Sequence, residues 1–539
     1  MNAADHDKRV VLPRWLPFRQ AAGQREATVF GTTPVVVDFG PTEQALLESV
    51  EAHRAVPSPY LAVELMGSAQ VLGHTAIARE MAEQVLAQSF LGPVAQEQAR
   101  AILGQSVSLV VGDEREQIKQ TKSRVRAFPQ DALAWMDQAR LYTVLGNFEK
   151  ARASVLAALH LAPGNRFVVR AAVRFFVHFG LWDEALRHAQ RGYALTADPL
   201  IFGPLLSVSS RLGKLPPRLK PLVQAAVNAP EPFLYSETLE AFGTMELMSG
   251  ADQRAKPFFR RAWRDPTQSV VGHSQWILRE HLPALAHEQK INFWSSKEAV
   301  SWLRYCMLDF SRTVIDANAW ALEEPYSRAP HILGSMAACM EGDFDEAVAT
   351  AKRGLLANPR DEILQNNLAF AYLRDGKVAE GAEAFVPLKG KLDDKSQVAT
   401  VATYGLLLMC QGDQEGGARY YGEAISRSLA QNNRRLAVRA TLNYLISTLD
   451  TAKTLDPSLL KPAQIAIGEL QDPGCFGAAA IIVRKLTKSD LSGSDALSTA
   501  AREFCAAFER ERERFEGSVV ANLLAAAPKP TEPTEPAPK

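Results

Sequence analysis

Carboxylate pairs recur in three short hexamers that also contain a glycine and an aromatic residue. The hexamers are GNFEKA (146–151), GLWDEA (180–185) and GDFDEA (342–347), and their acidic residues are Glu149, Asp183-Glu184 and Asp345-Glu346. Two carboxylates can serve as acid and base in a hydrolase only if they flank the bond that is cleaved. Neighbouring helix residues point about 100° apart and cannot do so. Because acidic residues in a first helical turn complement the helix dipole, we interpret these pairs as structural.

The histidines and cysteines form no metal-binding or nucleophile motif. His273, His281 and His287 lie near Glu280 and Glu288, but the HExxH motif of zinc proteases requires histidines one helical turn apart. The five cysteines contain no CxxC pair, so we predict neither a disulfide framework nor a zinc site. No phosphate loop, dinucleotide-binding glycine motif or GxSxG elbow occurs. We therefore predict a non-enzymatic protein without catalytic residues, metal or cofactor.

Length and composition indicate the general class of protein. The chain has 539 residues, of which 47% are hydrophobic, and its 60 Lys+Arg balance its 60 Asp+Glu. That length exceeds one hydrophobic core and favours several domains or a repeat architecture. A net charge of zero gives no global attraction to nucleic acid or to an acidic membrane. Because no signal-peptide pattern and no run of 18 uncharged apolar residues occurs, we predict a cytoplasmic protein without a membrane segment.

A period of 34 residues organises the first half of the chain. Gly112, Gly146 and Gly180 are 34 residues apart, and Pro129 and Pro163 keep the same interval. The three units are 98–131, 132–165 and 166–199. Apolar residues at helical spacing stand on both sides of the glycine, which allows a sharp turn, and the proline ends the second helix. Each unit is therefore predicted to be a helical hairpin.

These units resemble the tetratricopeptide repeat. The matching residues are Trp135, Ala139, Gly146, Phe148, Ala151, Ala158 and Pro163 in one unit, and Gly180, Trp182, Ala185 and Gly192 in the next. The resemblance implies an all-α solenoid of stacked helical hairpins that forms a right-handed superhelix. It also implies that the first helices of the hairpins line a concave groove, which such proteins use mostly to hold peptides or other proteins.

Further copies extend the array into two blocks. Weaker units occupy 60–86 and 237–263, and a second block contains Gly342, Gly376 and Gly412 at intervals of 34 and 36 residues. The predicted organisation is an irregular N-terminal segment (1–57) with extended chain at 27–40, an N-terminal block (58–199), degenerate helical repeats with a hinge (200–325), a C-terminal block (326–455), a helical cap (456–527) and a disordered Pro-rich tail (528–539).

The resemblance assigns groove positions in the first helices of the N-terminal block. They hold Met136 and Arg140 in one unit, and Phe167, Arg170, Arg174 and His178 in the next. Three arginines beside apolar residues suit a partner with acidic or phosphorylated residues, because guanidinium groups grip carboxylate and phosphate with two hydrogen bonds. The alternative is that these arginines pair with neighbouring acids. If they bind a partner, exchanging Arg170 and Arg174 for Glu abolishes partner capture without much change in melting temperature.

The same positions in the C-terminal block are less charged. They hold Ile332, Met336, Asn366 and Phe370, a strip that favours an apolar helix or an extended chain. Asn366 can both donate to and accept from the backbone of a bound peptide. The clamp of lysines and asparagines in the chaperone-binding members of the family is matched only by Asn367.

One basic run, RAKPFFRRAWR (254–264), interleaves arginines with aromatic residues, as nucleic-acid-binding stripes do. Because Ala255, Phe259 and Ala262 occupy the buried positions of a second helix, we expect its arginines on the outer surface. We predict a scaffold or adaptor that binds one or more partner proteins or peptides in the groove. The alternative is a peptide-sensing receptor that moves at a hinge in 213–232, and nucleic-acid binding ranks below both. The sequence predicts neither the partner nor the oligomeric state.

Overall fold

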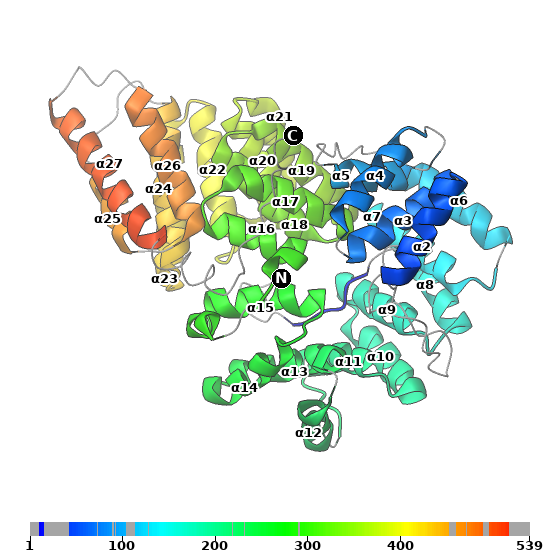
Figure 1. Cartoon of the computed structure of the whole chain (residues 1–539). Coiled ribbons are helices and arrows are strands. Elements are labelled where there is room, and N and C mark those ends of the chain that lie inside the picture. Colours follow the sequence, from blue (N-terminus) through cyan, green and yellow to red (C-terminus); the bar gives the residue numbers. More distant parts are fainter. Residues whose placement is uncertain are drawn as a thin grey trace, which may run out of the picture. The chain divides into compact units, whose positions relative to one another are not determined.

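The computed structural model describes residues 10–15, 43–72, 74–88, 91, 93–103, 114–127, 129–217, 219–230, 232–288, 291–451, 460–469, 472–488 and 495–516. Every regular element within these ranges is a helix (Figure 1). The all-α fold predicted from the sequence is therefore confirmed. The extended chain predicted at 27–40 and the tail at 528–539 lie outside the described residues.

The chain divides into two compact units, and each is described by itself. The N-terminal unit is Val10–Met245. Its helices are α2 (Glu43–Ala55), α3 (Pro59–Leu72), α4 (Thr75–Leu86), α5 (Pro93–Ile102), α6 (Glu114–Ala127), α7 (Ala132–Val144), α8 (Phe148–Leu161), α9 (Arg166–His178), α10 (Trp182–Thr196), α11 (Pro199–Leu212), α12 (Leu219–Asn228) and α13 (Pro232–Met248). The boundary with the second unit falls inside α13, later in the chain than the hinge predicted at 213–232.

The C-terminal unit contains Glu246–Lys539. Its helices after α13 are α14 (Asp252–Ala262), α15 (Gln268–Glu280), η2 (Pro283–His287), η3 (Phe293–Ser295), α16 (Lys297–Cys306), α17 (Phe310–Glu323), α18 (Arg328–Glu341), α19 (Phe344–Ala357), α20 (Glu362–Arg374), α21 (Val378–Phe385), η4 (Val386–Lys391), α22 (Val398–Cys410), α23 (Gln414–Ala430), α24 (Arg434–Thr451), α25 (Leu460–Glu469), α26 (Pro473–Lys488) and α27 (Asp495–Phe515). Consecutive helices pack as hairpins, and the first helices α16, α18, α20, α22 and α24 contact one another in that order.

The three hexamers form the elbows of hairpins, as the interval of 34 residues predicts. Gly146 and Gly342 have φ values of +66° and +95°, in the left-handed region that favours glycine. Asn147 accepts a hydrogen bond from a backbone N–H in the first turn of α8, and Asp343 does the same at α19. Asp183 lies within the first turn of α10 and does not cap it, since the cap position is occupied by Leu181.

Small residues let the two helices of a hairpin approach closely. Ala139 of α7 and Ala151 and Ala158 of α8 are fully buried where these helices pack. A Cβ atom on Gly192 would lie 2.8 Å from Val169 Cγ1, closer than carbon atoms pack. The signature residues of the repeat therefore stand where the helices meet.

One helix lies within the segment that we predicted to be irregular. Helix α2 covers Glu43–Ala55, so the predicted irregular segment 1–57 is corrected for this stretch. Leu46 and Val50 are buried and pack in one cluster with Leu65 and Met66 of α3. The third buried residue of α2 is His53, so only two of its buried positions are apolar, which is too short a periodic signal for a helix to be predicted from sequence.

Another hairpin has an elbow without glycine. Leu308 stands 34 residues before Gly342 and has a φ of +59°. Asp309 accepts a hydrogen bond from the Arg312 N–H at the start of α17, as Asp343 does at α19. Helices α16 and α17 thus continue the register of the C-terminal block backwards into the region 200–325. A bulky residue in the left-handed region is uncommon, which is why a glycine-based period missed this hairpin.

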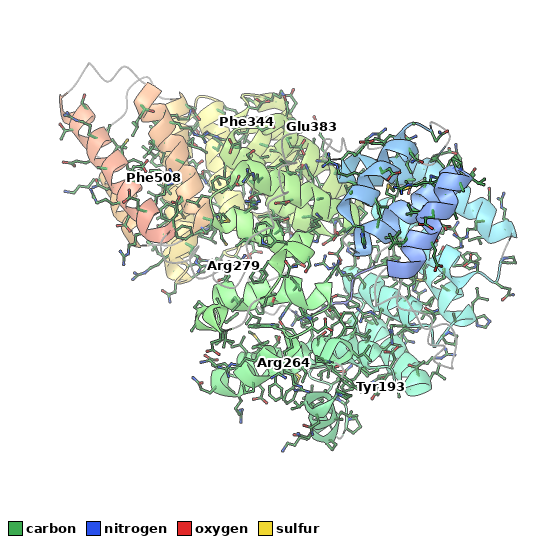
Figure 2. The ribbon with its side chains drawn as sticks, in the orientation of Figure 1. Tyr193, Arg264, Arg279, Phe344, Glu383 and Phe508 are labelled. Carbon is green, nitrogen blue, oxygen red and sulfur yellow. The ribbon has the colours of Figure 1, made fainter. Side chains whose placement is uncertain are left out.

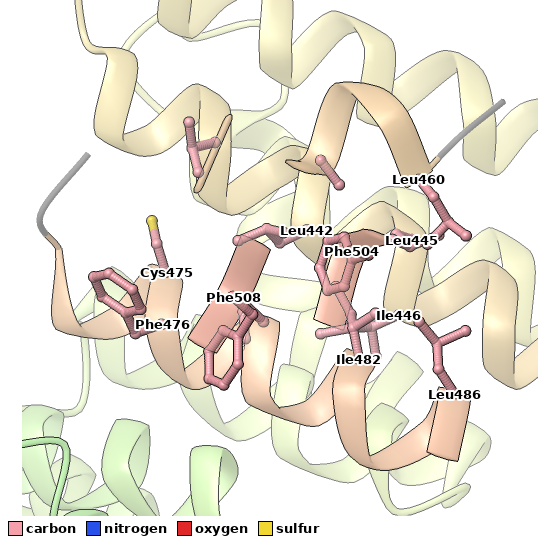
Figure 3. Packing of buried hydrophobic residues seen from close by; sticks show 14 of the residues in the cluster. Leu442, Leu445, Ile446, Leu460, Cys475, Phe476, Ile482, Leu486, Phe504 and Phe508 are labelled. Carbon is pink, nitrogen blue, oxygen red and sulfur yellow. The ribbon is translucent and has the colours of Figure 1, made fainter. Parts of the chain in front are cut away.

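The last four helices share one apolar core (Figure 3). Leu442 of α24, Leu460 of α25, Phe476 of α26 and Phe504 of α27 are all buried in it. The helical cap predicted for 456–527 corresponds to α25, α26 and α27 where the structure describes it.

Candidate partner-binding surface

The structure places Arg170 in the interior of the N-terminal unit. Only 3% of this residue is exposed, and its guanidinium donates to both carboxylate oxygens of Glu237 at 2.7 and 2.9 Å. It also donates to the Leu200 carbonyl oxygen at 2.5 Å. Arg170 therefore joins α9 to α11 and α13. This is the alternative that the sequence left open, and the prediction of Arg170 as a groove residue that binds a partner is corrected for this buried side chain.

A second arginine of α9 is also used inside the unit. Arg166 donates to Asp198 at 2.6 Å, and both side chains are less than a tenth exposed. Asp198 additionally accepts from the Leu200 N–H and so caps α11. Polar side chains thus hold consecutive first helices together here. Residue type and register alone do not distinguish such an internal arginine from one that faces a partner.

The remaining residues predicted for the N-terminal groove differ in exposure. Met136 and Phe167 are buried, while Arg140, Arg174 and His178 are half-buried. The ring of His178 packs against Phe179 with 4.6 Å between centroids. That these residues contact a partner stays a prediction.

In the C-terminal unit, residues 34 apart define one side of the first helices. Trp302, Met336 and Phe370 form one such row, and Cys306, Met340 and Arg374 form another. We call the surface formed by these two rows, together with Ile332 and Asn366, the first-helix face. It contains every groove residue predicted for the C-terminal block.

Helix α26 packs on part of the first-helix face through glycines. A Cβ atom on Gly477 would lie 2.8 Å from Met340 Sδ and 2.9 Å from Phe310 Cζ. A Cβ atom on Gly474 would meet the guanidinium of Arg439 first and lie 2.8 Å from Tyr305 Oη. Glycine within a helix lowers its stability by roughly 1 kcal/mol relative to alanine, so Gly477 marks a close helix crossing.

Polar contacts continue this packing along α26. Arg484 donates to the carbonyl oxygen of Met340 at 2.8 Å, and Lys485 forms an ion pair with Asp450. Asp450 in turn accepts from Arg374 of α20 at 2.5 Å. Helix α26 thus packs on α18 and α24, and Asp450 of α24 links it to α20.

The other end of the first-helix face remains partly exposed. Ile332, Asn366 and Phe370 are half-buried. The amide oxygen of Asn366 is buried and accepts no hydrogen bond from the described residues. The neighbouring Asn367 donates to Ser335 Oγ at 3.0 Å, so this amide links α20 to α18. Of these two asparagines, Asn366 is the one whose amide oxygen can still accept a hydrogen bond from a partner.

The surroundings of the buried cysteines keep their thiols protonated. Burial raises the pKa of the Cys339 thiol to about 12, and it also raises the pKa of Cys306 and of Cys475. A raised pKa keeps these groups as thiols, which are poor nucleophiles. Around His273 and His281 the partner is aromatic, since Trp276 packs against both rings. Within the described ranges, no cluster of three metal-binding side chains occurs.

The basic run lies as predicted for a second helix. Ala255, Phe259 and Ala262 of α14 are fully buried. On the outer side, Arg254 pairs with Glu246 at 2.9 Å and Arg260 with Glu288 at 2.5 Å. Arg264 is exposed just after α14 (Figure 2). Two arginines of the run thus already neutralise acids of the same unit. As for membranes, none of the described helices has the length and apolar character needed for a span.

Comparisons with known proteins concern the architecture alone. No protein-family model matches the chain, and no curated protein matches it. A solved structure of the APC/C hetero-tetramer Cut9–Hcn1 is 12% identical, with 85% of this chain and 92% of that chain covered and a TM-score of 0.35. Naa15/Naa10 bound to HypK-THB is 14% identical, with 89% and 92% covered and a TM-score of 0.23. Yeast Tom70 is 12% identical, with 86% and 99% covered and a TM-score of 0.28.

The assignment of the fold therefore follows from the hairpins of this chain. Elbows at Gly146, Gly180, Leu308, Gly342 and Gly376 recur at intervals of 34 residues within each unit and have positive φ values. Helices on either side of each elbow pack against each other and against the next hairpin. The residues that the structure describes form an all-helical fold built from helical hairpins of the tetratricopeptide type.

Proposed function

We propose that this chain is a non-enzymatic scaffold that holds a partner protein or peptide on the first helices of its hairpins. The observation that carries the proposal is the seating of α26 on the first-helix face of the C-terminal unit. Gly477 and Arg484 contact α18 there over a close helix crossing. A surface that holds one helix of its own chain has the shape and chemistry to hold a polypeptide.

The partner would occupy the end of the face that α26 leaves exposed. Ile332 and Phe370 offer apolar contact area, and the unpaired oxygen of Asn366 would accept a hydrogen bond from a backbone N–H of the partner. Leaving that buried oxygen without a donor costs about 1–3 kcal/mol, and a bound peptide would recover part of this free energy. The preformed helices limit the conformational entropy lost on binding.

The N-terminal unit would provide a second contact surface of different character. Arg140, Arg174 and His178 are half-buried and carry positive or titratable groups. They suit acidic or phosphorylated residues of a partner. Arg170 is left out of this surface because only 3% of it is exposed.

Affinity capture from the cells that make the protein tests this function. We would compare the parent chain with Asn366→Leu and Ile332→Glu, which alter the exposed end of the face. Ile315→Glu is the matched control, because Ile315 lies on the second helix α17 and is 65% exposed. The proposal predicts that a partner captured by the parent chain and by the control is lost from both face variants. Equal capture by all four proteins would contradict it.

The division into two compact units favours a second candidate, a receptor that moves when it binds a peptide. Small-angle scattering of the chain with and without a captured partner peptide tests this candidate. A change in radius of gyration on binding would support it, and superimposable curves would exclude it.

A further inference from the structure

A short N-terminal segment is buried in the N-terminal unit without being part of any helix. Residues 10–15 (VVLPRW) have no regular secondary structure, yet Val11 and Trp15 are each only 1% exposed and Arg14 is 6% exposed. Six residues outside any helix have no regular backbone hydrogen bonding to order them, and fixing each backbone residue costs about 1–2 kcal/mol. Contacts with the surrounding unit must therefore hold this segment in place.

Trp15 is anchored on aromatic rings of the repeats. Its ring meets that of Phe175 edge to face, with 6.2 Å between centroids and a 90° angle between planes. The Phe175 ring lies 5.0 Å from Phe179 and 6.1 Å from Phe148. We call Phe148, Phe175 and Phe179 the aromatic seat. Edge-to-face contacts of this kind add about 0.5–1.5 kcal/mol to the large apolar area that a tryptophan buries.

The aromatic seat is made by the two hairpins that keep the strictest repeat register. Phe148 begins α8, directly after the elbow of the first hairpin. Phe175 belongs to α9, and Phe179 follows α9 at the elbow of the second hairpin. All three rings of the seat therefore come from these two hairpins, and no residue of the N-terminal segment forms part of it.

The residues of the segment favour an extended backbone, as a peptide ligand bound in extended form would. Val10 and Val11 are β-branched and favour extended backbone, and the ring of Pro13 disfavours α-helical conformations at Leu12. A chain already confined to extended conformations loses little entropy on binding. Residues 16–42 separate Trp15 from the start of α2 at Glu43, so the segment is tethered to the unit that it occupies.

We propose that the aromatic seat is a recognition site for a tryptophan in an extended peptide, and that residues 10–15 occupy it as a tethered ligand. The segment lies on the seat through Trp15, with Pro13 and Arg14 also buried. A partner peptide with the same chemistry, a tryptophan preceded by an apolar stretch with Pro-Arg, binds there only by displacing the segment. The proposal concerns a surface other than the first-helix face of the C-terminal unit, and it does not depend on the function proposed above.

The tether sets how strongly the segment competes. Attachment within one chain gives an effective concentration of about 1 mM, so a free peptide with a dissociation constant near 10 µM would bind the parent chain about a hundredfold more weakly. Removing the tryptophan anchor from the chain removes the competitor while leaving the seat intact.

Binding of a fluorescein-labelled peptide with the sequence of residues 8–17 (KRVVLPRWLP) tests the proposal by anisotropy. The full chain with Trp15→Ala is expected to bind this peptide about a hundredfold more tightly than the parent chain does. The matched control is Trp182→Ala, which removes a partly exposed tryptophan at the start of α10 that is not one of the three rings of the seat, and it should bind as weakly as the parent. A peptide with alanine in place of its tryptophan should bind none of them.

A second measurement covers the case in which Trp15→Ala does not fold stably. The full chain with Trp15→Phe, which keeps an aromatic ring in place but weakens the anchor, is melted with and without the unlabelled peptide, and the proposal predicts that the peptide raises its melting temperature by several degrees. No binding to folded Trp15→Ala, equal binding to Trp15→Ala and the parent chain, or an unchanged melting temperature of Trp15→Phe would each overturn the proposal.

Discussion

Arg484 of α26 donates a hydrogen bond to the carbonyl oxygen of Met340 in the last turn of α18, although 144 residues separate them. The last carbonyl groups of a helix have no partner within that helix, so this arginine satisfies one of them and complements the negative end of the helix dipole. The contact joins the C-terminal cap to the middle of the repeat array. Packing of α26 on the first-helix face is therefore a specific feature of the unit.

Gly477 permits this packing, so a methyl group there should disturb it. Gly477→Ala places a Cβ atom 2.8 Å from Met340 Sδ and 2.9 Å from Phe310 Cζ. We expect the free energy of unfolding to fall by about 1 kcal/mol, because overpacking of about 1–3 kcal/mol outweighs the gain of about 1 kcal/mol in helix propensity. Urea unfolding measures the change.

The control for this variant is Gly422→Ala in α23. Gly422 is exposed, and a Cβ atom there would meet nothing within 4 Å. It should stabilise the protein by about 0.5–1 kcal/mol through helix propensity alone. If both alanine variants stabilise the chain equally, the close crossing of α26 over α18 is not present in solution.

The buried pair of Arg170 and Glu237 should be costly to break. Arg170→Met leaves the Glu237 carboxylate buried without its bidentate partner, and Glu237 is fully inaccessible. We expect a loss of about 3–5 kcal/mol in the free energy of unfolding. This replaces the expectation from sequence that exchanging Arg170 would hardly alter the melting temperature.

Lys214→Gln provides the comparison for that pair. Lys214 pairs with Asp183 at 2.6 Å, but both side chains are more than half exposed. Exposed pairs contribute about 0–1 kcal/mol, so this variant should unfold nearly as the parent does. Similar, small losses in both variants would show that Arg170 is solvated and available to a partner after all.

His331 should make the stability of the C-terminal unit fall in mild acid. Burial lowers the pKa of this histidine from 6.5 to about 4. The folded state therefore takes up no proton between these values while the unfolded state does, so stability is lost as the pH falls from about 6.5 towards 4. Between pH 6.5 and 5 the loss from this group is about 2 kcal/mol.

His331→Gln removes this particular pH dependence. Urea unfolding of the variant at pH 6.5 and at pH 5 should show about 2 kcal/mol less difference than the parent shows. His160→Gln, at an exposed position on α8, should retain the full difference. An unchanged pH dependence in the His331 variant would mean that this ring can be protonated in the folded protein.

The thiols should divide into two groups by reactivity. Burial raises the pKa of all five thiols, but Cys306, Cys339 and Cys475 are buried while Cys410 and Cys505 are half-buried and open to a reagent. A disulfide exchange reagent at neutral pH should label Cys410 and Cys505 first and the other three only on unfolding. Mass spectrometry of partially labelled protein identifies the sites. Early labelling of Cys306 would contradict its burial beside Arg279, which lies at the end of α15 (Figure 2).

Most of the helical framework was predictable because its signals are local. The interval between Gly146 and Gly180 placed two hairpins whose helices begin within a residue or two of the expected positions. The hairpin formed by α16 and α17 was not predicted from the glycine interval, because Leu308 occupies the elbow position that favours glycine. Its capping aspartate and the following phenylalanine repeat Asp343 and Phe344 and would have revealed the hairpin.

The candidate surface was less predictable because it depends on distant segments. Repeat register placed Arg170 on the groove side of α9, but its role is decided by Glu237, which is 67 residues away. In the same way, Met340 is covered by α26 from far along the chain, and Trp15 reaches Phe175 across a long stretch of sequence. Periodicity reports which side of a helix a residue occupies and carries no information about which later segment covers that side.

Site-specific photo-crosslinking tests the central claim most directly. A benzophenone amino acid is introduced at Asn366 on the first-helix face or at the exposed Ile315 of the second helix α17, and the cells that make the protein are irradiated. The proposed function predicts a discrete crosslinked adduct with another polypeptide from position 366 and none from position 315. An adduct from position 315 alone, or equal adducts from both positions, would contradict binding on the first-helix face.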